Sequence, residues 1–107
     1  MTRRVVVTGM GIVSSIGNNV AEVAQSLKDG RSGIVAAPTY TQLGFRSQVH
    51  AAPTLSPDDA ADRRARRFMG DGAAWNFAAM AQAIEDAGLE EHLVSNPRTG
   101  MVMGSGG

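Results

Sequence analysis

The sequence lacks cysteine altogether, and its 107 residues include only two histidines, His50 and His92. Without cysteine there are no disulfides and no thiolate metal ligands, and two histidines far apart in the sequence do not form a ligand cluster. No apolar run approaches the roughly 18 residues needed to span a bilayer, and no basic segment followed by an apolar one opens the chain. We therefore expect a cytoplasmic protein that holds no metal and does not insert into a membrane.

Glycine and β-branched residues are concentrated near the start of the chain. Residues 5–7 are all valine, a run without polar alternation that is typical of a strand covered on both faces, and we expect a strand over residues 3–8. Gly9 and Gly11 follow, where the backbone is expected to turn without a Cβ in the way. The pattern Gly9-x-Gly11-x-x-Ser14 lacks the third glycine of a dinucleotide-binding fingerprint and does not open directly into a helix. Among the possible functions, a Rossmann-type oxidoreductase is therefore the least favoured, and we expect no cofactor.

Capping residues predict where the first two helices lie. Asn19 is a good N-cap with Glu22 as its capping-box partner, and Gly30 ends the apolar pattern that follows. Residues 56–59, Ser-Pro-Asp-Asp, supply an N-cap, a proline at the first helical position and two acids in the first turn. We expect this second helix to break or bend near the glycines at positions 70 and 72.

A third helix is expected from residue 71 to residue 87, with Gly88 as its stop. It has almost no polar face, so we expect it to be buried nearly all round, with small residues that let other helices approach closely. Residues 47–51 and 100–103 are further extended candidates. These are too few strands for a finished parallel sheet, so residues 1–107 are interpreted as an incomplete domain.

Four arginines within residues 63–67 stand out in a chain whose formal net charge is +0. One interpretation is a solvated helix face on which these arginines pair with the nearby acids Asp58, Asp59 and Asp62. Against it, close-set like charges repel, and arginine is preferred where a planar fork must grip carboxylate or phosphate. Nucleic-acid binding would need aromatic residues that stack bases, whereas Phe68 and Trp75 have the pattern of core residues. We therefore expect an acidic protein partner and no nucleic acid.

Five short blocks carry a family resemblance: residues 8–19 (TGMGIVSSIGNN), 30–34 (GRSGI), 67–69 (RFM), 83–89 (AIEDAGL) and 104–107 (GSGG). Their identity and order resemble the N-terminal part of the β-ketoacyl-[acyl-carrier-protein] synthases of type I. The resemblance implies a thiolase-like fold with layers in the order α/β/α/β/α, of which this chain is only the N-terminal part.

The same resemblance implies a homodimeric acyltransferase of fatty-acid synthesis. Such enzymes condense malonyl-[acyl-carrier-protein], with loss of carbon dioxide, with an acyl group held on a cysteine, and two histidines assist. This chain has no cysteine, and His50 and His92 do not match the family's histidine motifs, so we expect no catalytic residue here. Two alternatives stay open: the ketosynthase of a polyketide pathway, which shares the opening motif, and a stand-alone module that binds a carrier protein without catalysis.

The resemblance also implies two binding regions. Arg63, Arg64 and Arg67 match positions that dock the acidic helix of acyl carrier protein, and Arg46 lies at another position that can join this surface. Arg66 goes beyond the family pattern. Gly106 and Gly107 match positions that line the acyl-substrate pocket, and glycine at position 107 favours type I over type II.

Overall fold

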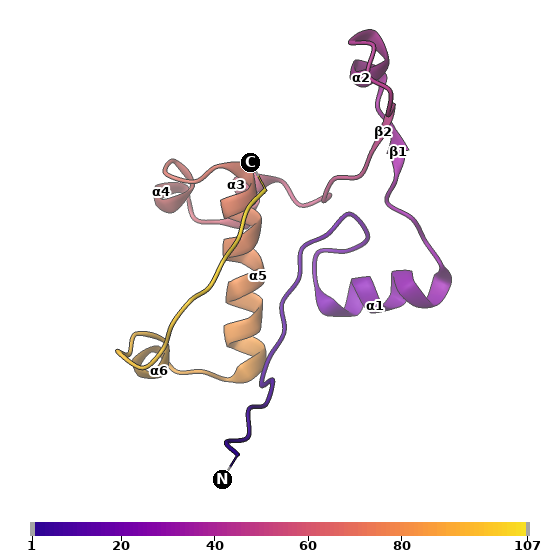
Figure 1. Ribbon diagram of the computed structural model, residues 1–107. Coiled ribbons are helices and arrows are strands. Elements are labelled where there is room, and N and C mark those ends of the chain that lie inside the picture. Colours follow the sequence, from indigo (N-terminus) through magenta and orange to yellow (C-terminus); the bar gives the residue numbers. More distant parts are fainter. Residues whose placement is uncertain (1, 107) are drawn as a thin grey trace.

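The computed structural model describes residues 2–106. Within them the chain forms six helices and one small antiparallel sheet (Figure 1). In chain order, the elements are α1 (Val20–Asp29), β1 (Val35–Ala36), α2 (Pro38–Gln42), β2 (Val49–His50), α3 (Pro57–Ala60), α4 (Arg63–Arg66), α5 (Asp71–Ala87) and α6 (Glu91–Val94). In the sheet, Val35 pairs with His50 and Ala36 with Val49. None of the helices in this part of the chain is both long and apolar enough to cross a bilayer.

Helix α1 begins and ends where the capping residues predict. The Asn19 side chain accepts a hydrogen bond from the amide of Glu22 at 2.9 Å, and Gly30 closes the helix with φ 65°. The Glu22 carboxylate accepts from the amide of Asn18 at 2.7 Å, one residue before the N-cap itself. The predicted capping box is thus confirmed, with its return bond displaced by one residue.

The segment from residue 56 to residue 70 differs from the single helix that was expected. Ser56 caps α3 as predicted, but Ala61 is extended (φ −142°, ψ 159°) and the helix ends at Ala60. Asp62 then starts a separate helix, because its carboxylate accepts from the amides of Arg64 and Ala65. The break therefore lies ahead of the two glycines, and the predicted long helix was wrong.

Two of the three expected strands do not form among the described residues. The three valines at positions 5–7 are 93%, 67% and 82% exposed, and residues 3–8 pair with no strand within residues 2–106. Residues 100–103 are likewise exposed and without strand structure. A strand forms only where it is hydrogen bonded to a neighbouring strand, so an apolar run alone was not sufficient to make one. The expected extended segment 47–51 is confirmed in shorter form as β2.

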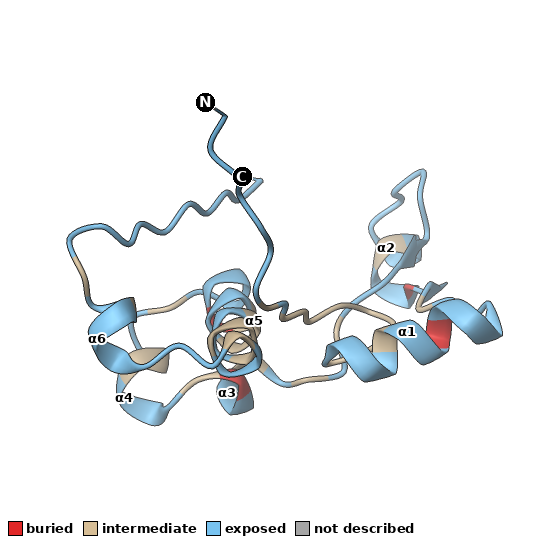
Figure 2. Cartoon of the chain, turned by 90° about the horizontal axis from the view of Figure 1, so that it is seen from below, coloured by how far each residue is buried: buried red, intermediate tan, exposed pale blue. Residues whose placement is uncertain are grey.

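Helix α5 has the predicted bounds and stops at Gly88 with φ 65°, but it is not buried all round. Of its residues, only Ala74 is fully buried, and the large side chains Phe77 and Met80 are exposed. Burial is concentrated instead on small residues, and Figure 2 shows the red segments as isolated patches. The expectation of a helix surrounded by neighbours is therefore not met within residues 2–106.

The backbone around Gly9 and Gly11 lies directly on α5. A Cβ on Gly11 would collide with the carbonyl oxygen of Ala79, and one on Gly9 with that of Ala83. Neither glycine has a positive φ, so their role is close approach to a helix and not the turn that was expected. The amide of Ile12 donates to Gln82 Oε1 at 3.1 Å, which holds the extended segment in place.

The overall shape is open. The radius of gyration is 17.1 Å, with principal extents of 55 × 36 × 27 Å, whereas a compact domain of this length has a radius of gyration of about 13 Å. The buried residues are Ala37, Ala60, Ala74 and Ser26, and no large side chain is fully buried in the described part of the chain. The structure therefore positions its surface groups through local caps and bonds between elements more than through a central core.

Candidate functional site

The arginine-rich segment forms a corner where α3, α4 and the start of α5 meet, which we call the arginine corner (residues 56–75). Ala60 and Ala74 are both buried there, which lets α3 pack closely against α5. The indole Nε1 of Trp75 donates to the carbonyl oxygen of Leu55 at 2.9 Å and fixes the start of α3 on α5. The corner is thus built on a rigid junction, from which α4 projects (Figure 1).

Arg66 is the one arginine of the corner that is turned inward. Its side chain is 22% exposed, and its Nε lies 3.0 Å from Asp58 Oδ1 while its Nη2 donates to Asp71 Oδ1 at 2.8 Å. Its Nη1 also donates to the carbonyl oxygen of Met69. A single guanidinium therefore links α3, the loop after α4 and the first residue of α5.

Arg63, Arg64 and Arg67 are exposed, and none of them belongs to an ion pair within residues 2–106. The interpretation of a self-paired helix face therefore holds for Arg66 alone: Asp62 is engaged as the cap of α4, and Asp59 pairs with no arginine in this part of the chain. A hollow of about 530 Å³ lies at the corner, lined by Asp58, Arg63, Arg66 and Arg67. Three positive charges are thus presented to solvent.

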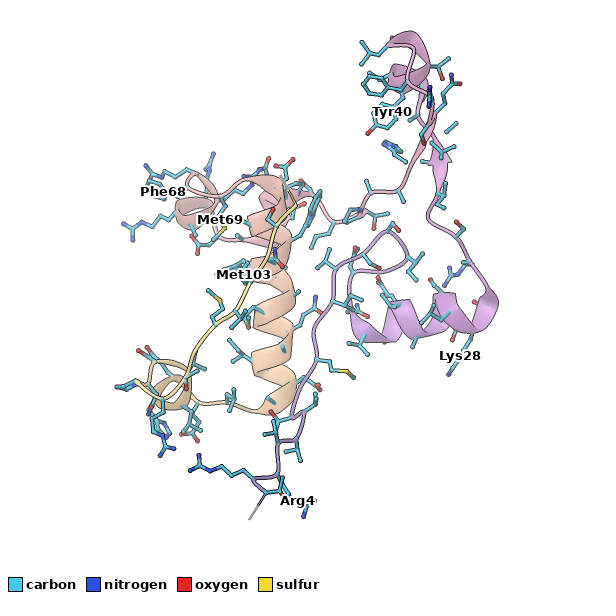
Figure 3. All side chains as sticks on the ribbon, in the orientation of Figure 1. Arg4, Lys28, Tyr40, Phe68, Met69 and Met103 are labelled. Carbon is cyan, nitrogen blue, oxygen red and sulfur yellow. The ribbon has the colours of Figure 1, made fainter. Side chains whose placement is uncertain are left out.

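Phe68 is also part of this surface and not of the core. It is 85% exposed, and the guanidinium carbon of Arg67 lies 5.6 Å from its ring centre. Figure 3 shows Phe68 at the outer side of α4, with Met69 nearer to α5. The expectation that Phe68 is a core residue was wrong, because α4 is too short and too exposed to bury its following turn. Trp75 is half-buried and hydrogen bonded, in better agreement with its predicted role.

The other candidate residues lie elsewhere. Arg46 is exposed in the segment between α2 and β2, which Figures 1 and 2 both place away from α4. Gly106 is exposed and outside any helix or strand, and Gly107 lies outside the described residues. The structure therefore brings together Arg63, Arg64 and Arg67 and leaves Arg46 apart.

The two histidines have local contacts. His50 makes an edge-on contact with Tyr40, with ring centres 5.7 Å apart. His92 Nδ1 lies 3.2 Å from Glu90 Oε2 on the exposed α6 turn. Within residues 2–106 there is no group of three or more histidine and acidic side chains that could hold a metal ion. The chemistry that this arrangement offers is the binding of negative charge at the arginine corner.

Sequence reasoning did not find the role of Arg66. Its partners are eight residues before it and five after it, and neither separation is the three or four at which helical residues meet. The signals in the sequence were that Arg66 goes beyond the family pattern and that Asp58 was among the acids expected to pair with the arginines.

Comparisons with known proteins identify the family to which the chain belongs. The family model for the N-terminal domain of β-ketoacyl synthases matches residues 2–107, and the chain belongs to this family. The chain is 53% identical over 104 residues to 3-oxoacyl-[acyl-carrier-protein] synthase 1 of Haemophilus influenzae, which covers 97% of this chain and 26% of the relative.

Two further relatives extend the comparison. Identity is 48% over 106 residues, 98% of this chain and 26% of the relative, with 3-oxoacyl-[acyl-carrier-protein] synthase 1 of Escherichia coli. It falls to 35% over 109 residues, 97% of this chain and 25% of the relative, with 3-oxoacyl-[acyl-carrier-protein] synthase 2 of Coxiella burnetii. The chain thus spans about a quarter of the length of the curated relatives it matches.

Proposed function

We propose that the protein carrying these residues elongates fatty-acyl chains as a 3-oxoacyl-[acyl-carrier-protein] synthase of type 1. The observation that supports this most is the identity of 53% to a synthase 1 across 97% of the chain, against 35% to a synthase 2. In the proposed reaction, malonyl-[acyl-carrier-protein] loses carbon dioxide and the resulting carbanion attacks an enzyme-bound acyl thioester. The carbon–carbon bond forms as the acyl–sulfur bond breaks, and 3-oxoacyl-[acyl-carrier-protein] is the product.

In this proposal the 107 residues supply binding surfaces and not the nucleophile, since they contain no cysteine. Arg63, Arg64 and Arg67 dock the acidic helix of the carrier. Their exposure, and the lack of an ion pair to any of them within residues 2–106, support this role. Unpaired guanidiniums retain their full attraction for an acidic partner and speed its association.

Three finer parts of the proposal rest on the family resemblance. Arg46 joins the docking surface only from the separate α2–β2 segment, so we assign it a secondary part. Gly106 and Gly107 contribute to the acyl-substrate pocket. The protein works as a homodimer in the cytoplasm, without a cofactor.

The test uses the full gene product and purified malonyl-loaded carrier, with association rates measured by stopped flow across a series of salt concentrations. Arg64→Glu and Arg67→Glu should each slow association and flatten its salt dependence. Lys28→Glu is the matched control, because Lys28 is an exposed cation on α1, away from the corner (Figure 3), and should leave the rate near that of the unchanged protein. Carrier association that is equally fast in all variants at every salt concentration would refute the docking role.

A further inference from the structure

The four arginines of the corner divide into two kinds. Arg63, Arg64 and Arg67 are exposed, while Arg66 faces two carboxylates and a main-chain carbonyl. One guanidinium between Asp58 and Asp71 has no positive charge left to offer to an acidic partner. Arg66 therefore differs from the other three arginines both in the direction of its side chain and in having its charge neutralised within the corner.

Helix α4 has little to hold it in place besides these contacts. It has four residues, which is far below the length at which a helix is stable by itself. The Asp62 cap fixes how its first turn begins, but a cap does not orient the helix relative to α5. The contacts of Arg66 with Asp58 on α3 and with Asp71 on α5 do, because they connect α4 to both neighbours at once.

We propose that Arg66 is a positioning residue: it clamps α4 between α3 and α5 so that Arg63, Arg64 and Arg67 face the carrier, and it does not contact the carrier itself. This inference rests on the proposed docking function. Arginine suits the task because Nη1 and Nη2 of its planar fork donate to Met69 and Asp71 at fixed angles while its Nε makes an ion-pair contact with Asp58. The single ammonium of lysine cannot reproduce this arrangement. The carboxylates of Asp58 and Asp71 are part of the clamp.

The direction in which carrier affinity changes in these variants distinguishes the clamp from simple electrostatic attraction. If charge alone mattered, Asp58→Asn and Asp71→Asn would tighten the binding of an acidic carrier, and Arg66→Lys would leave it unchanged. The clamp predicts the reverse: Arg66→Lys weakens carrier affinity roughly fivefold, and each asparagine variant weakens it to a smaller extent. Asp59→Asn is the control, since Asp59 is an exposed acid of α3 outside the ion pairs of residues 2–106, and it should bind the carrier as well as or better than the unchanged protein.

The experiment is carried out on the full gene product, with carrier affinity measured by titration and α4 followed by amide hydrogen exchange. The amides of Phe68 and Met69 donate to the carbonyl oxygens of Ala65 and Arg66, both at 3.0 Å, and report directly on the end of α4. Their exchange should accelerate in Arg66→Lys and Asp71→Asn and stay unchanged in Asp59→Asn. In turnover, Arg66→Lys should raise KM for the carrier substrate and leave kcat unchanged.

Two results would overturn the inference: unchanged exchange at these amides in Arg66→Lys, or tighter carrier binding by Asp58→Asn and Asp71→Asn. Failure of the proposed function has a different signature. In that case Arg66→Lys accelerates exchange in α4 while Arg64→Glu leaves carrier association untouched, which refutes docking and retains the clamp.

Discussion

Substitution of Gly11 by alanine tests the contact between the N-terminal segment and α5. The added Cβ would collide with the carbonyl oxygen of Ala79 and would lie 2.8 Å from the amide nitrogen of Ala83. Both groups belong to the backbone of α5 and cannot move aside as a flexible side chain would. The segment must therefore lift away from the helix.

The cost follows from the bonds that hold this segment. Lifting strains or breaks the bonds from the amide of Ile12 to Gln82 and from the amide of Met10 to Asp86, at 3.1 and 2.9 Å. Each such bond contributes about 0.5–1.5 kcal/mol net, and overpacking by one methyl group costs about 1–3 kcal/mol. We expect Gly11→Ala to lower the free energy of unfolding by about 2–6 kcal/mol in the full gene product.

The assay is chemical denaturation together with amide exchange at Ile12. Gly72→Ala is the matched control, because Gly72 lies inside α5 with open space around it. Alanine there should stabilise the protein by about 0.5–1 kcal/mol, since it favours the helix over the unfolded chain. A Gly11→Ala protein with unchanged unfolding and unchanged exchange at Ile12 would show that the contact with α5 does not exist.

Two further predictions concern the corner and the chain as a whole. Asp62→Ala removes the carboxylate that accepts two hydrogen bonds from main-chain amides at the start of α4, and it should destabilise that helix by about 1 kcal/mol. Amide exchange at Arg64 and Ala65 measures this loss, and unchanged protection there would contradict the cap. The isolated 107-residue polypeptide should show no cooperative thermal transition by circular dichroism, because it buries no large side chain within residues 2–106. A sharp melting curve would instead favour the stand-alone carrier-binding module.

Features set by neighbouring residues were predictable from the sequence. The Asn19 cap, the Gly30 and Gly88 stops and the bounds of α5 were each found, because their determinants lie within one helical turn of the feature. The split between α3 and α4 was missed because Asp62 was interpreted as a partner for arginine, whereas it bonds to main-chain amides. The competition between these two uses of a carboxylate is decided by backbone geometry.

Features that depend on distant partners were not predictable in the same way. The valines at positions 5–7 have the composition of a buried strand, but composition does not supply a neighbouring strand. Gly9 and Gly11 suggested a turn, although the determinant is the backbone of α5 about seventy residues later in the sequence. At the candidate site, the exposed arginines were identified from the resemblance, while the inward direction of Arg66 required Asp58 and Asp71 to be placed in space.

Helix α5 supports both the arginine corner and the N-terminal segment, and its length keeps these two regions apart. Its first residue, Asp71, belongs to the arginine corner, whereas Ala79, Gln82 and Ala83 hold the N-terminal segment. Eight residues of helix separate Asp71 from Ala79, which corresponds to about 12 Å along the axis. Sites separated by more than about 7–10 Å without shared partners contribute independently to stability. A loss of carrier affinity in Arg66→Lys therefore reports on the corner itself, and the glycine contact can be weakened by Gly11→Ala without turning the arginines away from the solvent.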